Sequence, residues 1–158
     1  MFNIIIEYLN EEEEIQVVSQ TTSLRTVQFE KTISGPEIVE FQRLVRKMPV
    51  ADSVMRYAVQ LARTSRPSGE NPPDFIKQYV NYGASLRASQ FLILGAKARG
   101  LIHGRYNVAV EDIQALAYPV FRHRILTNFH AESEGVRSEE IIRRLLETVP
   151  VPKSGLKD

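Results

Sequence analysis

The stretch from residue 83 to residue 113, GASLRASQFLILGAKARGLIHGRYNVAVEDI, decides the fold of this chain. Its apolar residues recur at helical spacing over Ser85–Ile102. The main stripe consists of Phe91, Leu94, Gly95, Ala98, Leu101 and Ile102, and it is widened by Leu92 and Ala96. A helix this apolar around its circumference is typical of the centre of a bundle. The sequence therefore predicts a mainly α protein, a helical bundle built around this segment.

The segments before this central helix also show helical patterns. Ser34 and Glu37 form a capping-box pattern, and Pro36 lies in the first turn of the helix that follows. Pro49 separates that helix from a second one. The predicted inner faces are Ile38, Phe41, Leu44, Val45 and Met48 on the first helix, and Val50, Val54, Tyr57, Ala58, Leu61 and Ala62 on the second.

Three further helices are predicted around the central one. A short helix follows the loop Arg63–Pro73 and ends near Gly83. A second covers Val110–Tyr118 and is broken or restarted at Pro119. The last covers Ser138–Thr148. Their inward-facing residues are Phe75, Ile76, Tyr79 and Val80 on the short helix, and Ile141, Ile142, Leu145 and Leu146 on the last.

The N-terminal segment Met1–Leu9 has the pattern of a β-strand. Ile4–Ile6 is a β-branched run too short for a helix, and such a run is typical of a strand buried in a parallel sheet. Only Arg25–Glu30 has further strand character. Because a lone strand leaves its backbone polar groups unpaired, the strand either pairs with that segment or belongs to a sheet outside this chain. Glu11–Gln20 follows as a helix whose four leading glutamates suit its N-terminus.

Composition excludes several classes of protein. The chain has 158 residues, a net charge of +1 and no cysteine, which excludes disulfides, zinc–thiolate sites and thiol catalysis. No apolar run approaches the length needed to cross a bilayer, and the acidic N-terminus does not suit a signal peptide. We therefore expect a cytoplasmic protein with no membrane partner. The balanced charge makes nucleic acid an unfavoured partner as well.

The motifs of common catalytic and metal sites are absent. The sequence has no phosphate-binding GxxxxGK[ST] loop, no GxGxxG, no HExxH and no GxSxG. His103, His123 and His130 have no partner at metal-ligand spacing, and Glu11–Glu14 is explained by a solvated helix start. We accordingly predict no catalytic residue and no metal ligand in this chain.

Basic residues gather in two regions. One is the compact cluster Arg122–His123–Arg124; the other consists of Arg43, Arg46, Lys47, Arg56, Arg63 and Arg66. They form either a surface for phosphates or an acidic partner, or ordinary polar helix faces. Aromatic residues are not interleaved with them, as a groove for single-stranded nucleic acid would require.

Arg87 is the candidate binding residue. Ser85 is a plausible N-cap, which places Arg87 in the first turn of the central helix, where the helix dipole disfavours a positive charge. An anion at the free N–H groups of this turn would explain the arginine, because a guanidinium can bind two phosphate or carboxylate oxygens. A solvent-facing arginine that tolerates a small dipole penalty is the other interpretation.

The stretch quoted above resembles the sensor-2 region of AAA+ ATPases of the MoxR family. In that family it commonly reads GAS-P-RA, followed by a long apolar helix, a GR step and a V-x-x-E/D-D-I helix start; here Arg105 and Glu111–Ile113 match the later parts. The opening FNIIIEYLNEEEEIQVV and the closing VFRHRILTNFHAESEGVRSEEIIRRLLETVP are similar to the family too. One departure is Leu86, which stands where the family usually has proline and puts the geometry of the helix start in doubt.

The resemblance implies that the chain is the C-terminal lid of an AAA+ ATPase, preceded by one orphan strand of the ATPase core. Residues 1–9 would be the last strand of that core, 10–35 a connector, 36–150 the helical lid and 151–158 a flexible tail. Arg87, next to Leu86, would be the sensor-2 arginine that contacts the γ-phosphate. ATP and Mg²⁺ would be held by the core domain, whose phosphate loop, metal-binding acid, sensor 1 and arginine finger would all lie upstream. We therefore do not expect the chain to be an enzyme alone.

The family also implies partners. These are the AAA+ core of the same protein, further copies in a ring, and client proteins that the ATPase remodels as a chaperone, including proteins with a von Willebrand factor A domain. Two alternatives remain open from the residues: a free-standing helical module that binds protein or nucleic acid, and a regulator that inserts into an ATPase ring.

Overall fold

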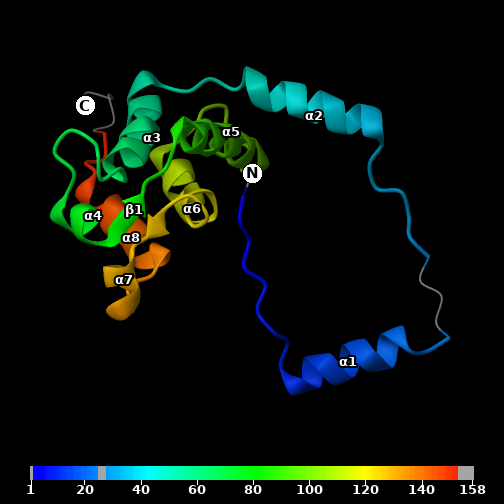
Figure 1. Cartoon of the computed structure of the whole chain (residues 1–158). Coiled ribbons are helices and arrows are strands. Elements are labelled where there is room, and N and C mark those ends of the chain that lie inside the picture. The colour runs from blue at the N-terminus through cyan, green and yellow to red at the C-terminus, as the bar shows by residue number, and fades with distance from the viewer. Residues whose placement is uncertain (1, 25–27, 153–158) are drawn as a thin grey trace.

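The computed structural model describes residues 2–24 and 28–152, and over these residues the chain forms eight helices and two short strands (Figure 1). The helices are α1 Glu11–Thr21, α2 Gly35–Lys47, α3 Asp52–Thr64, α4 Asp74–Tyr79, α5 Leu86–Ile102, α6 Val110–Phe121, α7 Phe129–Ser133 and α8 Ser138–Thr148; the strands are β1 Val80–Tyr82 and β2 Leu126–Thr127. The predicted mainly α fold is confirmed. Within the described ranges, no helix combines the length and the apolar character that a membrane span requires.

Helix α5 lies at the centre of the bundle, as predicted. It packs against α6, α3 and α2, and α8 covers the other side of α6. The face of α5 that is fully buried carries Ala88, Leu92 and Ala96, which follow one another at intervals of four residues. Two alanines on this face let the neighbouring helices approach closely. Gly100 extends the same face, because a Cβ there would lie 2.5 Å from the Met48 side chain.

The predicted inward stripe of α5 is only partly correct: Gly95 is buried, but other members are not. Ile102 is 82% exposed, and Phe91 and Leu94 are only partly buried. Leu92 and Ala96, which were expected to widen the stripe, instead lie at its centre. Because α5 is apolar on nearly every side, its periodicity contains little information about orientation, and packing against α3 and α6 decides the buried face.

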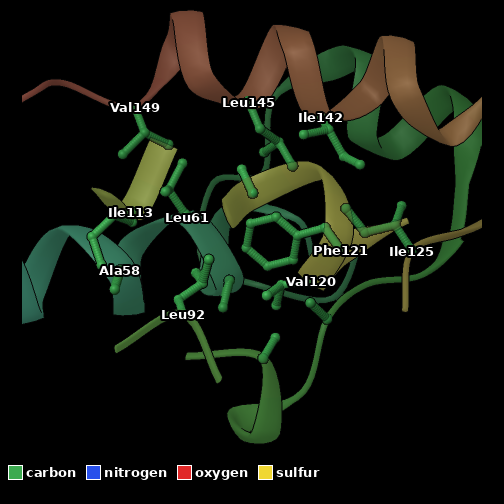
Figure 2. Packing of buried hydrophobic residues seen from close by; sticks show 14 of the residues in the cluster. Ala58, Leu61, Leu92, Ile113, Val120, Phe121, Ile125, Ile142, Leu145 and Val149 are labelled. Atoms are coloured by element: carbon green, nitrogen blue, oxygen red, sulfur yellow. The ribbon is translucent and has the colours of Figure 1, made fainter. Parts of the chain in front are cut away.

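The core is formed by α3, α5, α6 and α8 together. Figure 2 shows the ring of Phe121 pointing into the middle of the labelled aliphatic side chains. The predicted inner faces of α3 and α8 are confirmed, since Tyr57, Leu61, Ile141, Ile142 and Leu145 are at most 1% exposed. These helices are strongly amphipathic, so their sequence pattern identifies one buried face.

Helix α6 continues through Pro119, contrary to the predicted break. Proline removes one backbone N–H, which leaves the carbonyl group of Ala115 without its helical donor. Ala115 is exposed, so water can bind that carbonyl. The helix ends two residues later at Phe121, whose carbonyl accepts hydrogen bonds from the N–H groups of Arg124 (2.8 Å) and Ile125 (3.0 Å).

Two short strands were not predicted. The segment before Gly83 was expected to be helical, but α4 ends at Tyr79 and β1 follows. Strand β1 pairs antiparallel with β2, with Val80 opposite Thr127 and Tyr82 opposite Leu126. Three and two residues are too few to show a strand pattern in the sequence. Helix α7, capped by the Asn128 side chain, was likewise not predicted.

The N-terminal segment forms no strand with the described part of this chain, and a sheet outside the chain stays a prediction. Residues 2–9 have no regular secondary structure, and Ile6 and Tyr8 are 90% and 101% exposed. A strand requires a neighbour, and within the described part of the chain β1 and β2 pair only with each other. Residues 28–30 form no strand either, while residues 25–27 of the alternative partner lie outside the described residues. The segment is attached through Asn3, whose N–H donates to the Pro119 carbonyl (2.7 Å).

Helices α1 and α2 have no fully buried residue. Both begin with a capping box, Asn10 with Glu13 and Ser34 with Glu37, so their predicted starts are confirmed. Figure 1 shows α1 well separated from the bundle. The predicted inner face of α2 is mostly exposed, and only Met48, just after the helix, is buried. Of the expected tail at residues 151–158, residues 153–158 lie outside the described residues.

A network of ion pairs on α8 predicts a pH dependence. Glu140 accepts hydrogen bonds from Arg143 (2.7 Å) and Arg144 (2.7 Å). These two hydrogen bonds lower the pKa of Glu140 from 4.5 to about 2, and the bond from Arg143 has the larger effect. Since the folded pKa lies below the unfolded one, this network stabilises the fold above pH 4.5 and loses its contribution as the pH falls toward 2.

Carboxyl carbon NMR titration measures this pKa directly. In Arg143→Gln the pKa of Glu140 is expected to rise toward 4.5. The control is Arg137→Gln, which replaces the N-cap residue of the same helix. This variant is expected to leave the pKa of Glu140 unchanged. An equally low pKa in Arg143→Gln would contradict the assigned cause.

Candidate functional site

The candidate site lies at the start of helix α5. Ser85 is the N-cap residue, as predicted, but its side chain makes no capping hydrogen bond. Leu86 and Arg87 are the first two residues of the helix, and both are exposed. The first turn contains no acidic residue, and Arg87 makes no ion pair with any residue in the described ranges. The positive charge at this helix end is therefore not neutralised locally.

The strand pair brings a second arginine to this place. Tyr82 lies opposite Leu126 in the β1–β2 pair. The chain leaves Tyr82 toward the start of α5, and it reaches Leu126 from the turn that contains Arg124. Pairing of the two strands consequently places the turn after α6 beside the first turn of α5. Sequence reasoning missed this proximity, since it depends on strands of two and three residues.

Arg124 is held against the side of α5. Its guanidinium lies over the Phe91 ring, 5.3 Å from the centroid, and donates a hydrogen bond to the Val120 carbonyl. Burial lowers the pKa of Arg124, and the positive charge of Arg87 lowers it further. Phe91 lies one helical turn after Arg87, so the two guanidinium groups share one side of the helix. The resulting field is positive and favours an anion.

The predicted cluster Arg122–His123–Arg124 does not act as one basic surface. Arg122 binds Glu139 (2.6 Å) and the Asn3 carbonyl (3.3 Å). His123 is exposed over much of its surface, and the partial burial of its ring, followed by the charge of Arg124, lowers its pKa. Only Arg124 of the three contacts α5 through Phe91.

The other basic residues fall into different environments. Arg56 forms an exposed ion pair with Asp52 (3.7 Å), whereas the Arg66 Nε donates to the Ala84 carbonyl (2.8 Å). Arg46 offers its backbone carbonyl to Lys97 (3.1 Å). Binding of nucleic acid or an acidic partner by this group stays a prediction.

The remaining candidates have local roles. His130 stacks on Tyr79 at 5.6 Å between ring centroids, and His103 contacts the Arg99 carbonyl (2.8 Å). Glu11–Glu14 forms the first turn of α1, as predicted. Among the residues that the structure describes, no group of three or more His, Cys, Asp or Glu side chains could hold a metal ion.

A buried carboxylate joins the ends of α5 and α6. Asp112, whose side chain is 1% exposed, accepts hydrogen bonds from Arg105 (2.7 and 2.5 Å) and from the Ala109 N–H (2.9 Å). The Arg99 Nε lies 3.3 Å away. Burial alone would raise the pKa of Asp112, but the hydrogen bonds from Arg105 and Ala109 and the two positive charges outweigh it, and the pKa is lowered.

The chain is similar to several known proteins. Residues 75–145 match the family model of the AAA lid domain. The chain is 26% identical to Chaperone MoxR1 of Mycobacterium tuberculosis, over 97% of this chain and 40% of that protein. It is 29% identical to the uncharacterized protein YeaC of Bacillus subtilis, over 96% of this chain and 45% of that protein.

A solved structure extends the comparison to three dimensions. The crystal structure of a Cytophaga hutchinsonii protein assigned as an ATPase superposes with a TM-score of 0.86 at 31% identity, over 97% of this chain and 47% of that one. The chain thus spans less than half the length of the relatives it matches. Residues 75–145 therefore have the pattern of the AAA lid domain, and over nearly all of its length the chain is homologous to Chaperone MoxR1 and to the Cytophaga hutchinsonii protein.

Proposed function

We propose that this chain acts as the lid of an AAA+ ATPase and that Arg87 contacts the γ-phosphate of ATP. The nucleotide and its Mg²⁺ are held by an ATPase core domain, and the lid supplies one cation at the open side of the phosphates. The single observation that supports this role is an exposed first-turn arginine without an ion pair in the described residues. The domain as a whole fits this role through its likeness to AAA lid domains.

The start of α5 suits a phosphate for electrostatic reasons. The helix N-terminus and Arg87 both contribute positive potential there, and Arg124 lies close enough to Arg87 for the two charges to interact. An anion at the helix start lowers the electrostatic energy of the N-terminus and of Arg87. Arg87 can bind two phosphate oxygens through its planar guanidinium, and Leu86, 65% exposed, forms the apolar rim beside it.

A contact to the γ-phosphate distinguishes ATP from ADP. A lid that binds one nucleotide state more tightly than the other shifts its orientation on hydrolysis. In this proposal that rotation drives chaperone-like remodelling of a client protein, within a ring of identical subunits. We include clients with a von Willebrand factor A domain in the same proposal. This part of the proposal is supported only by the likeness to Chaperone MoxR1.

The test is Arg87→Ala in the ATPase that carries this lid. Loss of a charge-assisted hydrogen bond is expected to reduce the preference for ATP over ADP about tenfold, as measured by fluorescent-nucleotide displacement. Arg56→Ala, which removes an exposed arginine of α3, is the matched control and should leave the preference unchanged. An unaltered ratio of ATP to ADP affinity in Arg87→Ala would contradict the proposed contact of Arg87 with the γ-phosphate.

A further inference from the structure

The end of helix α3 meets Ala84, the residue before the N-cap of α5. Ser65 follows α3 directly and is completely buried, as is Ala84. The Ser65 hydroxyl accepts a hydrogen bond from the Ala84 N–H (2.8 Å) and donates one to the Ala62 carbonyl (2.7 Å). The hydroxyl therefore joins the last turn of α3 to the backbone of Ala84.

The next residue binds the other backbone group of Ala84. The Arg66 Nε donates to the Ala84 carbonyl (2.8 Å). Arg66 is itself held in a turn, because its N–H donates to the Arg63 carbonyl (3.1 Å) and its carbonyl accepts from the Gly69 N–H (3.1 Å). Two consecutive side chains thus hold both polar groups of one peptide residue, an arrangement we call the Ala84 clamp, formed by Ser65 and Arg66.

The two segments are in direct backbone contact at Gly83. A Cβ on this glycine would lie 2.2 Å from the Ser65 carbonyl oxygen and 2.6 Å from the Arg66 Cα. These are backbone atoms that cannot rotate away. The glycine is thus required by the close approach of the chains, and the clamp has little room to shift.

The Ala84 clamp fixes the start of α5, which has no side-chain N-cap of its own. Ser85 makes no side-chain cap, so the first turn of α5 has no internal fixation of the kind that usually defines a helix N-terminus. Ala84, which precedes the N-cap Ser85, is instead fixed from outside, by Ser65 and Arg66. Arg87 is three residues beyond Ala84, and a change in the direction of the first turn would displace its long side chain.

We propose that Ser65 and Arg66 are positioning residues: by clamping Ala84 they set the direction of the first turn of α5 and hence the reach of the Arg87 guanidinium. The inference rests on the proposed contact of Arg87 with phosphate. It adds that the phosphate-binding geometry is determined by the two residues that follow α3, which need not touch the nucleotide themselves.

The first measurement needs no ligand. Backbone ¹⁵N relaxation of the 158-residue chain reports the order of residues 86–88. In Arg66→Ala the order parameters of this turn are expected to fall from about 0.85 to below about 0.7. Arg66→Lys, which retains a donor and the charge, should restore part of the order. Arg63→Ala, at the same end of α3, should leave it unchanged. Equal order in Arg66→Ala and the unmodified chain would overturn the clamp.

The second measurement separates positioning from general stability. Binding of inorganic tripolyphosphate to the same chain is followed by the backbone amide NMR signals of residues 86–88, which are present in every variant. Arg66→Ala is expected to weaken binding about fivefold, the effect of one hydrogen bond, but to have no further effect when Arg87→Ala is also present. An equal loss in both backgrounds would assign Arg66 a purely structural role. If Arg87→Ala alone does not weaken binding, the proposed phosphate contact fails, and the relaxation data still decide whether the clamp exists.

Discussion

Replacing Asp112 with alanine is expected to lower the free energy of unfolding by about 3 kcal/mol, the lower end of the cost of breaking a buried ion pair. The variant leaves Arg105 and the Ala109 N–H without their acceptor. The cost stays at the lower end because Arg105 and Arg99 are 35% and 41% exposed, so water can reach part of each guanidinium group, although the Arg99 Nε itself is buried.

Urea unfolding followed by circular dichroism measures this loss. Glu111→Ala, an exposed carboxylate in the same helical turn, is the matched control and should cost below about 1 kcal/mol. Since the folded pKa of Asp112 is lowered, its contribution is present above pH 3.8 and is lost as the pH falls below that value. A similar loss of unfolding free energy in the two variants would show that the buried contacts of Asp112 stabilise the fold no more than an exposed carboxylate does.

Phe121→Ala is expected to destabilise the chain by about 4 kcal/mol, because it removes a large side chain from a closely packed core and leaves a cavity. Phe121 is completely buried and lies at the end of α6 (Figure 2). Its backbone carbonyl also supports the turn that carries Arg124. The substitution keeps that carbonyl, so the loss reports packing alone.

The matched control is Phe129→Ala. Phe129 is 83% exposed, and its removal is expected to change stability by less than about 0.5 kcal/mol. Both variants are compared with the unmodified chain by the same urea titration. A loss below about 2 kcal/mol for Phe121→Ala would mean that the surrounding helices collapse into the space.

The sequence predicts the core of the bundle where helices have one apolar face. Leu61 on α3 and Ile141 on α8 lie where periodicity places them, because polar residues occupy the opposite side of each helix. The orientation of α5 could not be predicted in this way. Its side chains are apolar on most faces, so the choice between Leu92 and Phe91 as inward residue depends on the neighbours.

Helix α2 has a clear apolar face in the sequence, but that face is not buried in the structure. Ile38 and Phe41 have clear helical spacing, yet they are 44% and 55% exposed. Amphipathic periodicity predicts that a face will be covered but not what covers it. The same holds for Ile4–Ile6, whose pattern indicates a strand, although a strand exists only where a second one provides hydrogen bonds.

Arg87 could be singled out from the sequence because its type conflicts with its place in a helix. Its surroundings could not. The approach of Arg124 depends on the β1–β2 pair, and the clamp joins residues 65 and 84 across an intervening loop and helix. Neither contact has a local signature, since each is made by one or two side chains between distant segments.

The short connection between α5 and α6 has a consequence for how the chain reaches this structure. Arg105 and Asp112 are seven positions apart, and their ion pair closes the loop between the two most extensively packed helices. A loop this short loses little chain entropy when its ends meet. The α5–α6 hairpin can therefore assemble from local contacts, while α3 and α8 must each be brought from farther along the chain. Folding begins, on this view, with the hairpin that carries Arg87, and the clamp from α3 closes on a helix that already exists.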